Sequence, residues 1–454
     1  MAFRDKFILE PHFFKVLAGL ALPIALQDLI KFSLSLSDNL MVGNLSEAAL
    51  SAVTLANQPF FIFSLLSFGM ASGGGVLVAQ YYGKHDAESI SKIVSITLSV
   101  SLIGAFLFGA IILCFPHSVM RLFTNSEELI RIGAEYLKIQ GWTYFLFGFS
   151  NTLIMLMRST REVKAGLIVT TCSFVLNIFL NWILIFGHLG FPAFGVRGAA
   201  YGTLISRSLE CAAMIIYVRF IDRHLHFRFS KLFHFDKLLF KDFAHFSLPV
   251  AINECGWSTG IAAQSVVLGH LSTTIVAAAS IVGTLQQIAL VFIYGVAGAS
   301  APILGNLLGS GKNAELAKPY ANTLLLSGFF VGIIMASTLY IFKDPLLSLY
   351  AIPQNTIDLA KTLIFIQCLM IILQSYTSPA IVGILRSGGD TTFTSALDIG
   401  SLWLFSIPLG YLAGFRWELS FPLVFLFLRS DEIFKLPILV WRIEHKRWIK
   451  NVTR

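Results

Sequence analysis

The chain has 454 residues, of which 56% are hydrophobic and only 13% are charged, and its mean hydropathy is +0.76. Because soluble globular chains carry about 25% charged residues, this composition excludes a soluble protein and predicts an all-α polytopic membrane protein. The formal net charge of +8 does not indicate a nucleic-acid partner, since basic residues that hold cytoplasmic loops in place account for it.

Apolar stretches of span length predict twelve transmembrane helices. The first span follows the basic start MAFRDKFILEPHFFK and lacks a small-residue cleavage site, so it is not a cleaved signal peptide. The expected spans are roughly 14–43, 50–80, 90–114, 130–156, 164–188, 194–220, 242–270, 275–308, 316–342, 356–384, 392–414 and 417–441. The five cysteines show no metal-ligand spacing and are expected to pack without forming disulfides.

The first span carries a carboxylate, Asp38, in its second half. An isolated charge in hydrocarbon costs roughly 3 kcal/mol on insertion scales. Lys31, on the same helix, is seven residues away, so no basic residue lies within one turn of Asp38. Asp38 is therefore expected to be protonated, to face a wet cavity or to hold a cation. The alternative is a carboxylate at the membrane interface.

The distribution of Lys and Arg predicts that both termini are cytoplasmic. With the amino terminus inside, the inner loops and tails hold 22 of the 33 basic residues and the outer loops hold six. The segment 221–241 is basic and aromatic, as expected for a linker on an anionic membrane surface. The expected domains are an amino-terminal six-helix lobe (1–220), this linker, a carboxy-terminal six-helix lobe (242–441) and a cytoplasmic tail (442–454).

The two halves of the chain are copies of one another. An offset of 226 residues matches Leu22-Pro23 with Leu248-Pro249, Asp28 with Glu254 and Gly69 with Gly295, and an offset of 228 matches Arg158-Ser159 with Arg386-Ser387. Six spans per copy give both copies the same orientation, so a pseudo-twofold axis along the membrane normal relates the two lobes. This plan is typical of an alternating-access carrier. The partner of Asp38 is Gln264, so the carboxylate at this depth belongs to the first lobe alone.

Several motifs, in this order, resemble the multidrug and toxic compound extrusion (MATE) transporters over essentially the whole chain. They are LPIALQDLIKFSLSLSDNLMVGNLS, GMASGGGVLVAQYYGKHDAE, MRSTREVKAG, NIFLNWILIFGHLGFPAFGVRGAAYGT and GILRSGGDT. The resemblance implies a secondary antiporter, not an enzyme, that needs no cofactor. Such a protein exports organic, often cationic, amphiphiles in exchange for Na+ or H+ by rocking two lobes around a central cleft.

The resemblance also implies a coupling-ion site in the first lobe. Asp38 matches the acid of the family's first span, and Asn177, Asn181 and Thr203 match positions that complete the site in some members. The two asparagines lie four residues apart and hence on one helix face, and with Asp38 and Thr203 they offer the oxygen ligands that Na+ prefers. Those members have a second Asp at the position of Asn181. The alternative for both asparagines is hydrogen bonding between helices.

In the second lobe, Glu254 matches an acid in span seven that some branches of the family use for coupling. Those branches pair it with an Asp in span ten, which is absent from span ten here. Asp398 in span eleven is the other candidate of this lobe. Four pairs of neighbouring opposite charges are expected to neutralise themselves: Asp28 with Lys31, Arg207 with Glu210, Arg429 with Asp431, and Glu432 with Lys435.

Two other functions remain open. A flippase for a lipid or a lipid-linked oligosaccharide would need several unpaired Arg or Lys residues in its cleft, whereas four of the five basic residues within spans have an acid nearby. A membrane-embedded enzyme would need converging His, Cys or carboxylate groups, but most of the ten His lie outside the spans. The expected partners are small organic cations or other amphiphiles and membrane lipid. The expected form is a monomer in the cytoplasmic (inner) membrane.

Overall fold

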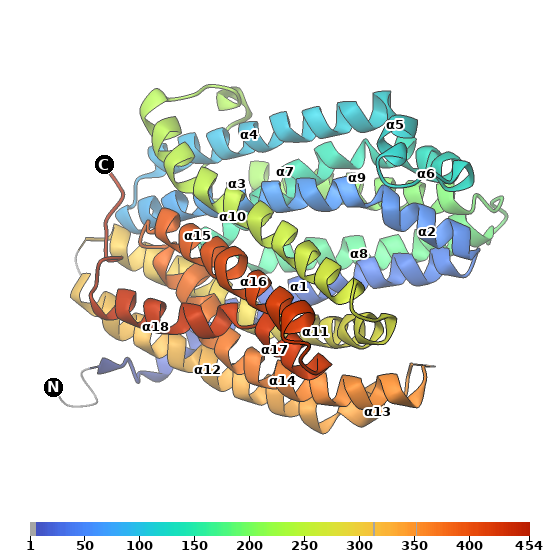
Figure 1. Ribbon diagram of the computed structural model, residues 1–454. Helices are drawn as coiled ribbons and strands as arrows, with labels where there is room; N and C mark the ends of the chain where they lie inside the picture. Colours follow the sequence, from blue (N-terminus) through green and yellow to red (C-terminus); the bar gives the residue numbers. More distant parts are fainter. Residues whose placement is uncertain (1–5, 312–313, 351) are drawn as a thin grey trace. The chain divides into compact units, whose positions relative to one another are not determined.

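The computed structural model describes residues 6–311, 314–350 and 352–454, and its regular elements there are all helical (Figure 1). The helices of the first half are α1 (Pro11–Gly43), α2 (Glu47–Ala56), α3 (Gln58–Lys84), α4 (Ala87–Cys114), α5 (Pro116–Arg121), α6 (Glu127–Gln140), α7 (Thr143–Ser159), α8 (Lys164–Phe186) and α9 (Val196–Phe220). Arg4 and Lys312, both counted in predicting the orientation, lie outside the described residues.

The second half begins after a short 3-10 turn, η2 (Phe229–Lys231). Its elements are α10 (Lys237–Gly269), α11 (Thr273–Gly309), the 3-10 turn η3 (Ala314–Leu316), α12 (Ala317–Ile341), α13 (Lys343–Leu347), α14 (Gln354–Ser378), α15 (Thr391–Gly400), α16 (Ile407–Tyr411), α17 (Phe421–Leu428) and α18 (Asp431–Glu444). Three π-helical segments interrupt or extend these helices: η4 (Pro379–Leu385), η5 (Ser401–Ser406) and η6 (Leu412–Arg416).

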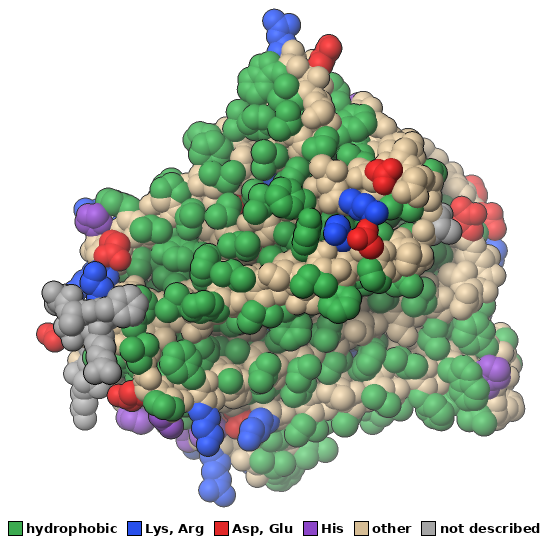
Figure 2. Space-filling model, turned by 90° about the horizontal axis from the view of Figure 1, so that it is seen from below, with side chains coloured by type: hydrophobic (Ala, Val, Ile, Leu, Met, Phe, Trp, Pro, Cys, Tyr) green, Lys and Arg blue, Asp and Glu red, His purple; other side chains and the backbone are tan. Residues whose placement is uncertain are grey.

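Eight helical runs among the described residues are long and apolar enough to cross a membrane. The remaining four expected spans coincide with α6–α7, α9, α10 and α17–α18, which are broken or carry charged residues. The twelve expected spans are thus all helical. The face in Figure 2 is covered mainly by hydrophobic side chains with few charged groups, as a surface in contact with lipid requires.

Polar side chains at helix starts explain several boundaries. Ser46 accepts a 3.0 Å bond from the backbone N–H of Ala49 and begins α2. Asp236 accepts bonds from the N–H groups of Leu238 and Leu239, so α10 begins at Lys237 and not at the expected residue 242. The bond from Leu239 holds the pKa of the Asp236 carboxyl below its usual value.

The described residues form two compact units. One unit contains the residues up to Ala25, together with Ala79–His85 and the chain from Ile252 onward. The other contains Leu26–Val78 and Asp86–Ala251. Helices α1, α3 and α10 therefore each contribute residues to both units. The division into lobes at residues 220 and 242 stays a prediction.

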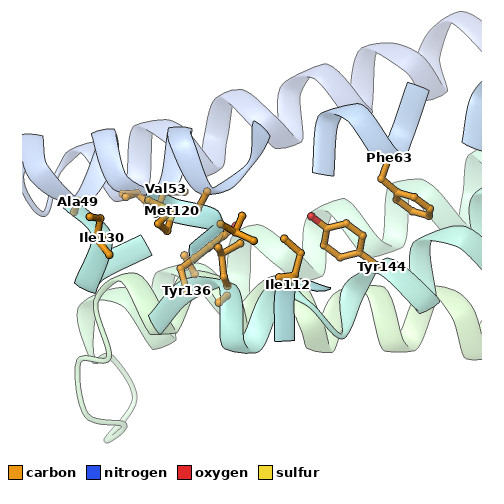
Figure 3. Packing of buried hydrophobic residues seen from close by; sticks show 14 of the residues in the cluster. Ala49, Val53, Phe63, Ile112, Met120, Ile130, Tyr136 and Tyr144 are labelled. Carbon is orange, nitrogen blue, oxygen red and sulfur yellow. The ribbon is translucent and has the colours of Figure 1, made fainter. Parts of the chain in front are cut away.

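Each unit has its own apolar core. In the unit that contains α2 and α4–α9, the core is an aliphatic and aromatic cluster that includes Ala49, Val53, Phe63, Ile112, Met120, Ile130, Tyr136 and Tyr144 (Figure 3). In the unit that contains α11–α18, buried residues of α11, α12 and α14 form a second cluster, with Val282, Ile293, Leu363 and Ile371 fully buried. Because lipid is as apolar as these side chains, close van der Waals packing, and not exclusion of water, is what stabilises such clusters inside a membrane.

Helix contacts confirm that the two halves are structural copies. A methyl group added to Gly69 of α3 would meet the backbone of Ala251 in α10. A methyl group added to Gly295 of α11 would meet Ala25 in α1. Because the offset of 226 residues relates both members of the two contacts, α3 packs on α10 as α11 packs on α1.

The ends of α3 and α11 also make a reciprocal contact. Gly83 lies against the backbone of Asn306, and Gly309 lies against the backbone of Gln80. Gly83 and Gly309 are 226 residues apart, as are Gln80 and Asn306, so each contact is the repeat copy of the other. A side chain at either glycine would push the helices apart, so the sequence repeat specifies this close crossing.

Candidate ion-binding site

The expected first-lobe residues lie together on three helices. Asp38, half-buried on α1, accepts a 2.6 Å hydrogen bond through Oδ1 from Asn181 Nδ2 of α8. Asn181 also donates to Asn177 Oδ1 at 3.1 Å, one turn earlier on the same helix. Asn177 in turn donates to Thr203 Oγ1 of α9 at 3.4 Å. The four residues named from the sequence therefore form one continuous polar chain.

Ser206 is a fifth member that the sequence interpretation missed. Its Oγ accepts a 3.4 Å bond from Asn177 Nδ2 and donates a 3.1 Å bond to the Thr203 carbonyl. Ser206 lies three residues after Thr203, so both face α8 from one side of α9. The spacing of three residues from Thr203 could have identified Ser206 from the sequence.

One oxygen of this chain has no partner. Asn181 is fully buried, and its Oδ1 makes no hydrogen bond within the described part of the chain. The atom lies against Gly202 of α9, where a methyl group would collide with it. A buried acceptor without a donor is costly. Because Asn181 Oδ1 lies next to the Asp38 carboxylate, it is suited to bind a monovalent cation, or to accept a hydrogen bond from a water molecule when Asp38 is protonated.

Asp28 and Lys31 do not form the expected pair. Arg158 of α7 lies 2.9 Å from Asp28 Oδ1 and also donates to Gln27 Oε1. Lys31 instead donates to Asn151 Oδ1 at 3.0 Å. A guanidinium from the neighbouring helix outcompetes the i,i+3 lysine because it can bond two acceptors of α1 at once.

The expected Arg207–Glu210 pair is confirmed. The two side chains lie 2.9 Å apart on α9, and Glu210 also accepts a 2.8 Å bond from Ser150 of α7. Both charges are thus satisfied within two adjacent helices.

In the second half, Glu254 of α10 lies 3.3 Å from Arg386, the residue that follows η4. This pair is the repeat copy of Asp28 with Arg158. Next to it, Asn253 donates a 3.1 Å bond to Asp398 of α15. Gln27 donates a bond of the same length to Thr170 of α8, which an offset of 228 equates with Asp398.

Asp398, the other second-lobe candidate, lies in a cluster of charged side chains. Lys435 of α18 lies 2.9 Å from Asp398 and 3.0 Å from Glu432, which confirms the expected Glu432–Lys435 pair. Asp431 pairs with Lys435 at 2.9 Å. Arg429, its expected partner, stacks over the ring of Phe425 at 5.4 Å. Asp431 pairs with Lys435 and not with Arg429 because the buried lysine lies within reach of all three acids.

The repeat position of Asp38 holds a neutral amide with a structural role. Gln264 of α10 donates to Ser406 Oγ at 3.0 Å and to the Leu428 carbonyl at 2.5 Å. Among the described residues, no group of three or more His, Cys, Asp and Glu side chains forms a metal site. An ion site in the first lobe would thus combine one carboxylate with amide and hydroxyl oxygens.

Comparisons with known proteins match both halves of the chain to one family. The MatE family model matches residues 23–183 and 249–412, one match in each half. A probable multidrug resistance protein NorM of Rhizobium meliloti (strain 1021) is 28% identical over 428 residues, covering 91% of this chain and 88% of the relative. A probable multidrug resistance protein NorM of Thermotoga maritima is 24% identical and covers 97% of this chain and 94% of the relative.

Solved structures show the same fold. A MOP superfamily transporter from Pyrococcus furiosus superposes with a TM-score of 0.86 at 19% identity, covering 95% of each chain. An outward-facing multidrug resistance MATE family transporter of the MOP superfamily also gives 0.86 at 19% identity, covering 95% of this chain and 96% of the other. The family match in both halves and the shared all-helical fold establish that this chain is a multi-pass membrane transporter of the MatE family, and not an enzyme.

Proposed function

We propose that this protein is a secondary antiporter that exports organic, often cationic, amphiphiles in exchange for Na+ or H+. The multidrug resistance names of its relatives support the substrate class. The observation that carries the coupling is the polar chain from Asp38 through Asn181 and Asn177 to Thr203, with its unpartnered buried oxygen.

The coupling is a competition at Asp38. As a carboxylate in surroundings of low dielectric constant, Asp38 attracts the cationic substrate. A proton on Asp38 removes that attraction. A Na+ ion held between Asp38 and the oxygens of Asn177, Asn181 and Thr203 has the same effect. Because substrate and ion favour different arrangements of the two lobes, each ion bound from outside drives substrate out.

The aromatic residues, 13% of the chain, supply surface for stacking and cation–π contact without strict demands on shape. The protein acts as a monomer in the cytoplasmic membrane, among membrane lipids and with both termini inside. The linker 221–241 lies on the inner leaflet.

Neither second-lobe candidate is assigned a coupling role of the Asp38 type. Glu254 neutralises Arg386, as Asp28 neutralises Arg158, and Asp398 helps to hold Lys435. These contacts also argue against a lipid or lipid-linked oligosaccharide flippase. Arg207 and Lys435, which such a protein would use to bind phosphate, have carboxylate partners.

The test is efflux of a fluorescent cationic dye from proteoliposomes, driven by a Na+ gradient alone and then by a pH gradient alone. Wild type should respond to one of them, and Asp38→Asn should respond to neither. Asp28→Asn, the same change on the same helix, is the control and should keep driven efflux. Wild-type efflux by a folded Asp38→Asn variant would overturn the role of Asp38, and no efflux with either gradient would favour the flippase.

A further inference from the structure

A lysine in the last membrane helix is surrounded by more acids than it can neutralise. Lys435 is buried, and its ammonium lies 2.9 Å from Asp398, 2.9 Å from Asp431 and 3.0 Å from Glu432. One positive charge thus faces three carboxylates inside the membrane. Buried charges of one sign require neutralisation, because desolvation otherwise costs several kcal/mol per ion.

Counting every charged group that faces this cluster gives one acid too many. The acids are Glu254 of α10, Asp398 of α15, and Asp431 and Glu432 of α18, and the bases are Arg386 after η4, Arg429 before α18 and Lys435 of α18. The neutral polar groups that face the cluster are Asn253 of α10, Tyr294 of α11, and Gln374 and Thr377 of α14. The acids number four and the bases three among the described residues. One monovalent positive charge is therefore missing.

The hydrogen bonds indicate which of the carboxyls around Lys435 takes up the missing positive charge. Glu432 accepts from Thr377 at 2.5 Å and from Gln374 at 3.4 Å, and Asp398 accepts from Asn253 at 3.1 Å, all in addition to Lys435. Several donors stabilise an ionised carboxylate. Asp431 is bonded by Lys435 alone within the part of the chain that the structure describes. Of the three carboxyls that share Lys435, it therefore receives the fewest side-chain hydrogen bonds.

The first half shows that the fold does not require this cluster. At the offset of 228, Arg207 stands where Lys435 stands, and it is neutralised by a single acid, Glu210. The residue equivalent to Asp431 is Thr203, a member of the candidate ion site of the first lobe. The second lobe therefore has a carboxyl where the first lobe contributes a hydroxyl.

The helical span that carries Asp431 is interrupted immediately before this residue. Helix α17 ends at Leu428 and α18 begins at Asp431, whereas the repeat-related α9 runs unbroken from Val196 to Phe220. Gln264 and Ser406 both donate to the Leu428 carbonyl that the break leaves free. Irregular backbone inside a membrane is tolerated where it lines a site, and broken helices of transporters point their ends at bound ions.

The cluster also contains polar atoms without partners. Asn253 Oδ1 and Arg386 Nε make no hydrogen bond to any described residue, and both side chains are only 2% exposed. A closed structural network would satisfy these atoms. An acceptor and a donor are thus available next to the acids for a water molecule that exchanges a proton.

From this geometry we infer that Asp431 is a second proton-binding carboxyl, located in the carboxy-terminal lobe and separate from Asp38. Lys435 already fills the space between the carboxylates, so the missing charge is a proton rather than a metal cation. With Asp431 protonated, Lys435, Arg386 and Arg429 balance Asp398, Glu254 and Glu432. Loss of the proton leaves one uncompensated charge, which favours an arrangement of this lobe that admits water.

The direct test is infrared difference spectroscopy of the purified protein from mildly acidic to mildly alkaline pH. The stretching band of a protonated carboxyl should be present in wild type and should be lost on deprotonation. Asp431→Asn, which keeps the size of the side chain and fixes it as neutral, should lose one such component. Glu210→Gln, which removes a buried acid with a one-to-one partner, should leave the spectrum unchanged.

A second variant keeps the inference falsifiable if Asp431→Asn fails to fold. Lys435→Gln removes a positive charge, so the carboxyl band should persist to higher pH than in wild type. A wild-type spectrum in a folded Asp431→Asn protein, or an unchanged midpoint in Lys435→Gln, would overturn the assignment.

The role in transport rests on the antiport proposed above, whereas the protonation of Asp431 does not. In proteoliposomes, Asp431→Asn should move one proton fewer per dye molecule than wild type and still export dye. If the infrared band is Asp431-dependent but no gradient drives efflux, the antiport fails and the proton site stands. If driven efflux depends on Asp38 but the infrared band is unaffected by Asp431→Asn, the antiport stands and the proton site at Asp431 fails.

Discussion

Glu254 lies 3.3 Å from Arg386, and this ion pair joins the first helix of the second half to the segment that follows η4. The same two positions of the first half hold Asp28 and Arg158, 2.9 Å apart. Because both halves contain this ion pair and both share the same fold, we assign the pair a structural role. The two copies differ at Asp38, whose counterpart is the neutral Gln264, and at Asp431, whose counterpart is Thr203.

Glu254→Gln should therefore lower stability without abolishing coupling. Removing one partner of a buried pair costs about 3–5 kcal/mol, because the remaining charge stays uncompensated. The expected result is a lower unfolding temperature in detergent, with efflux still driven by the gradient. The double variant Glu254→Gln with Arg386→Met should regain most of the lost stability. Loss of driven efflux in a protein of wild-type stability would instead make Glu254 a coupling residue.

Asn181→Asp should strengthen ion binding at the first-lobe site. The variant places a second carboxylate 2.6 Å from Asp38, and two carboxylates so close cannot both be ionised without a proton or cation between them. The half-saturating concentration of the coupling ion should fall by at least about tenfold, or about 1.4 kcal/mol. The measurement is dye efflux against external ion concentration. Asn151→Asp, which changes the partner of Lys31, is the control and should leave this concentration unchanged.

The sequence predicted the residues of the polar chain and two of the four expected ion pairs, but it did not predict the partner of Asp28 or the full set of acids around Lys435. The resemblance to the MATE family indicated Asn177, Asn181 and Thr203, and helical spacing placed the two asparagines on one face. Asp38 follows from the cost of a charge in a span. The partner of Asp28 lies 130 residues away on α7, and no local pattern connects them. The i,i+3 rule therefore chose Lys31. Likewise Lys435 was assigned one acid, because Asp398 comes to it only through the packing of α15 on α18. Local spacing specifies which residues share a face, and only the fold specifies which faces meet.

Gly202→Ala should impair the first-lobe site without a change of any polar residue. The added methyl group would collide with Asn181 Oδ1, so the amide must rotate and weaken its bond to Asp38. Overpacking of this kind costs about 1–3 kcal/mol. The expected result is weaker coupling-ion binding, measured as a higher half-saturating ion concentration. Gly19→Ala in α1, where a methyl group meets nothing within 4 Å, should keep the wild-type value. Equal values in the two variants would contradict a role for the Asn181 amide.

Gln80→Leu should release the carboxy-terminal tail. Gln80 is fully buried at the end of α3, donates to the carbonyls of Ser387 and Lys450 and accepts from the N–H of Val452. One side chain thus binds the tail to the segment after η4. Leucine would leave these backbone groups without their partner, at about 1–3 kcal/mol for each buried group.

The measurement for Gln80→Leu is the rate of trypsin cleavage in the tail, which contains Lys450. Cleavage should be faster in the variant than in wild type, because the tail must leave its site before a protease can bind it. Gln58→Leu changes an exposed residue at the other end of α3 and should keep the wild-type rate. Equal cleavage of Gln80→Leu and wild type would mean that the buried Trp448 and the Asp390–Arg442 ion pair hold the tail without Gln80.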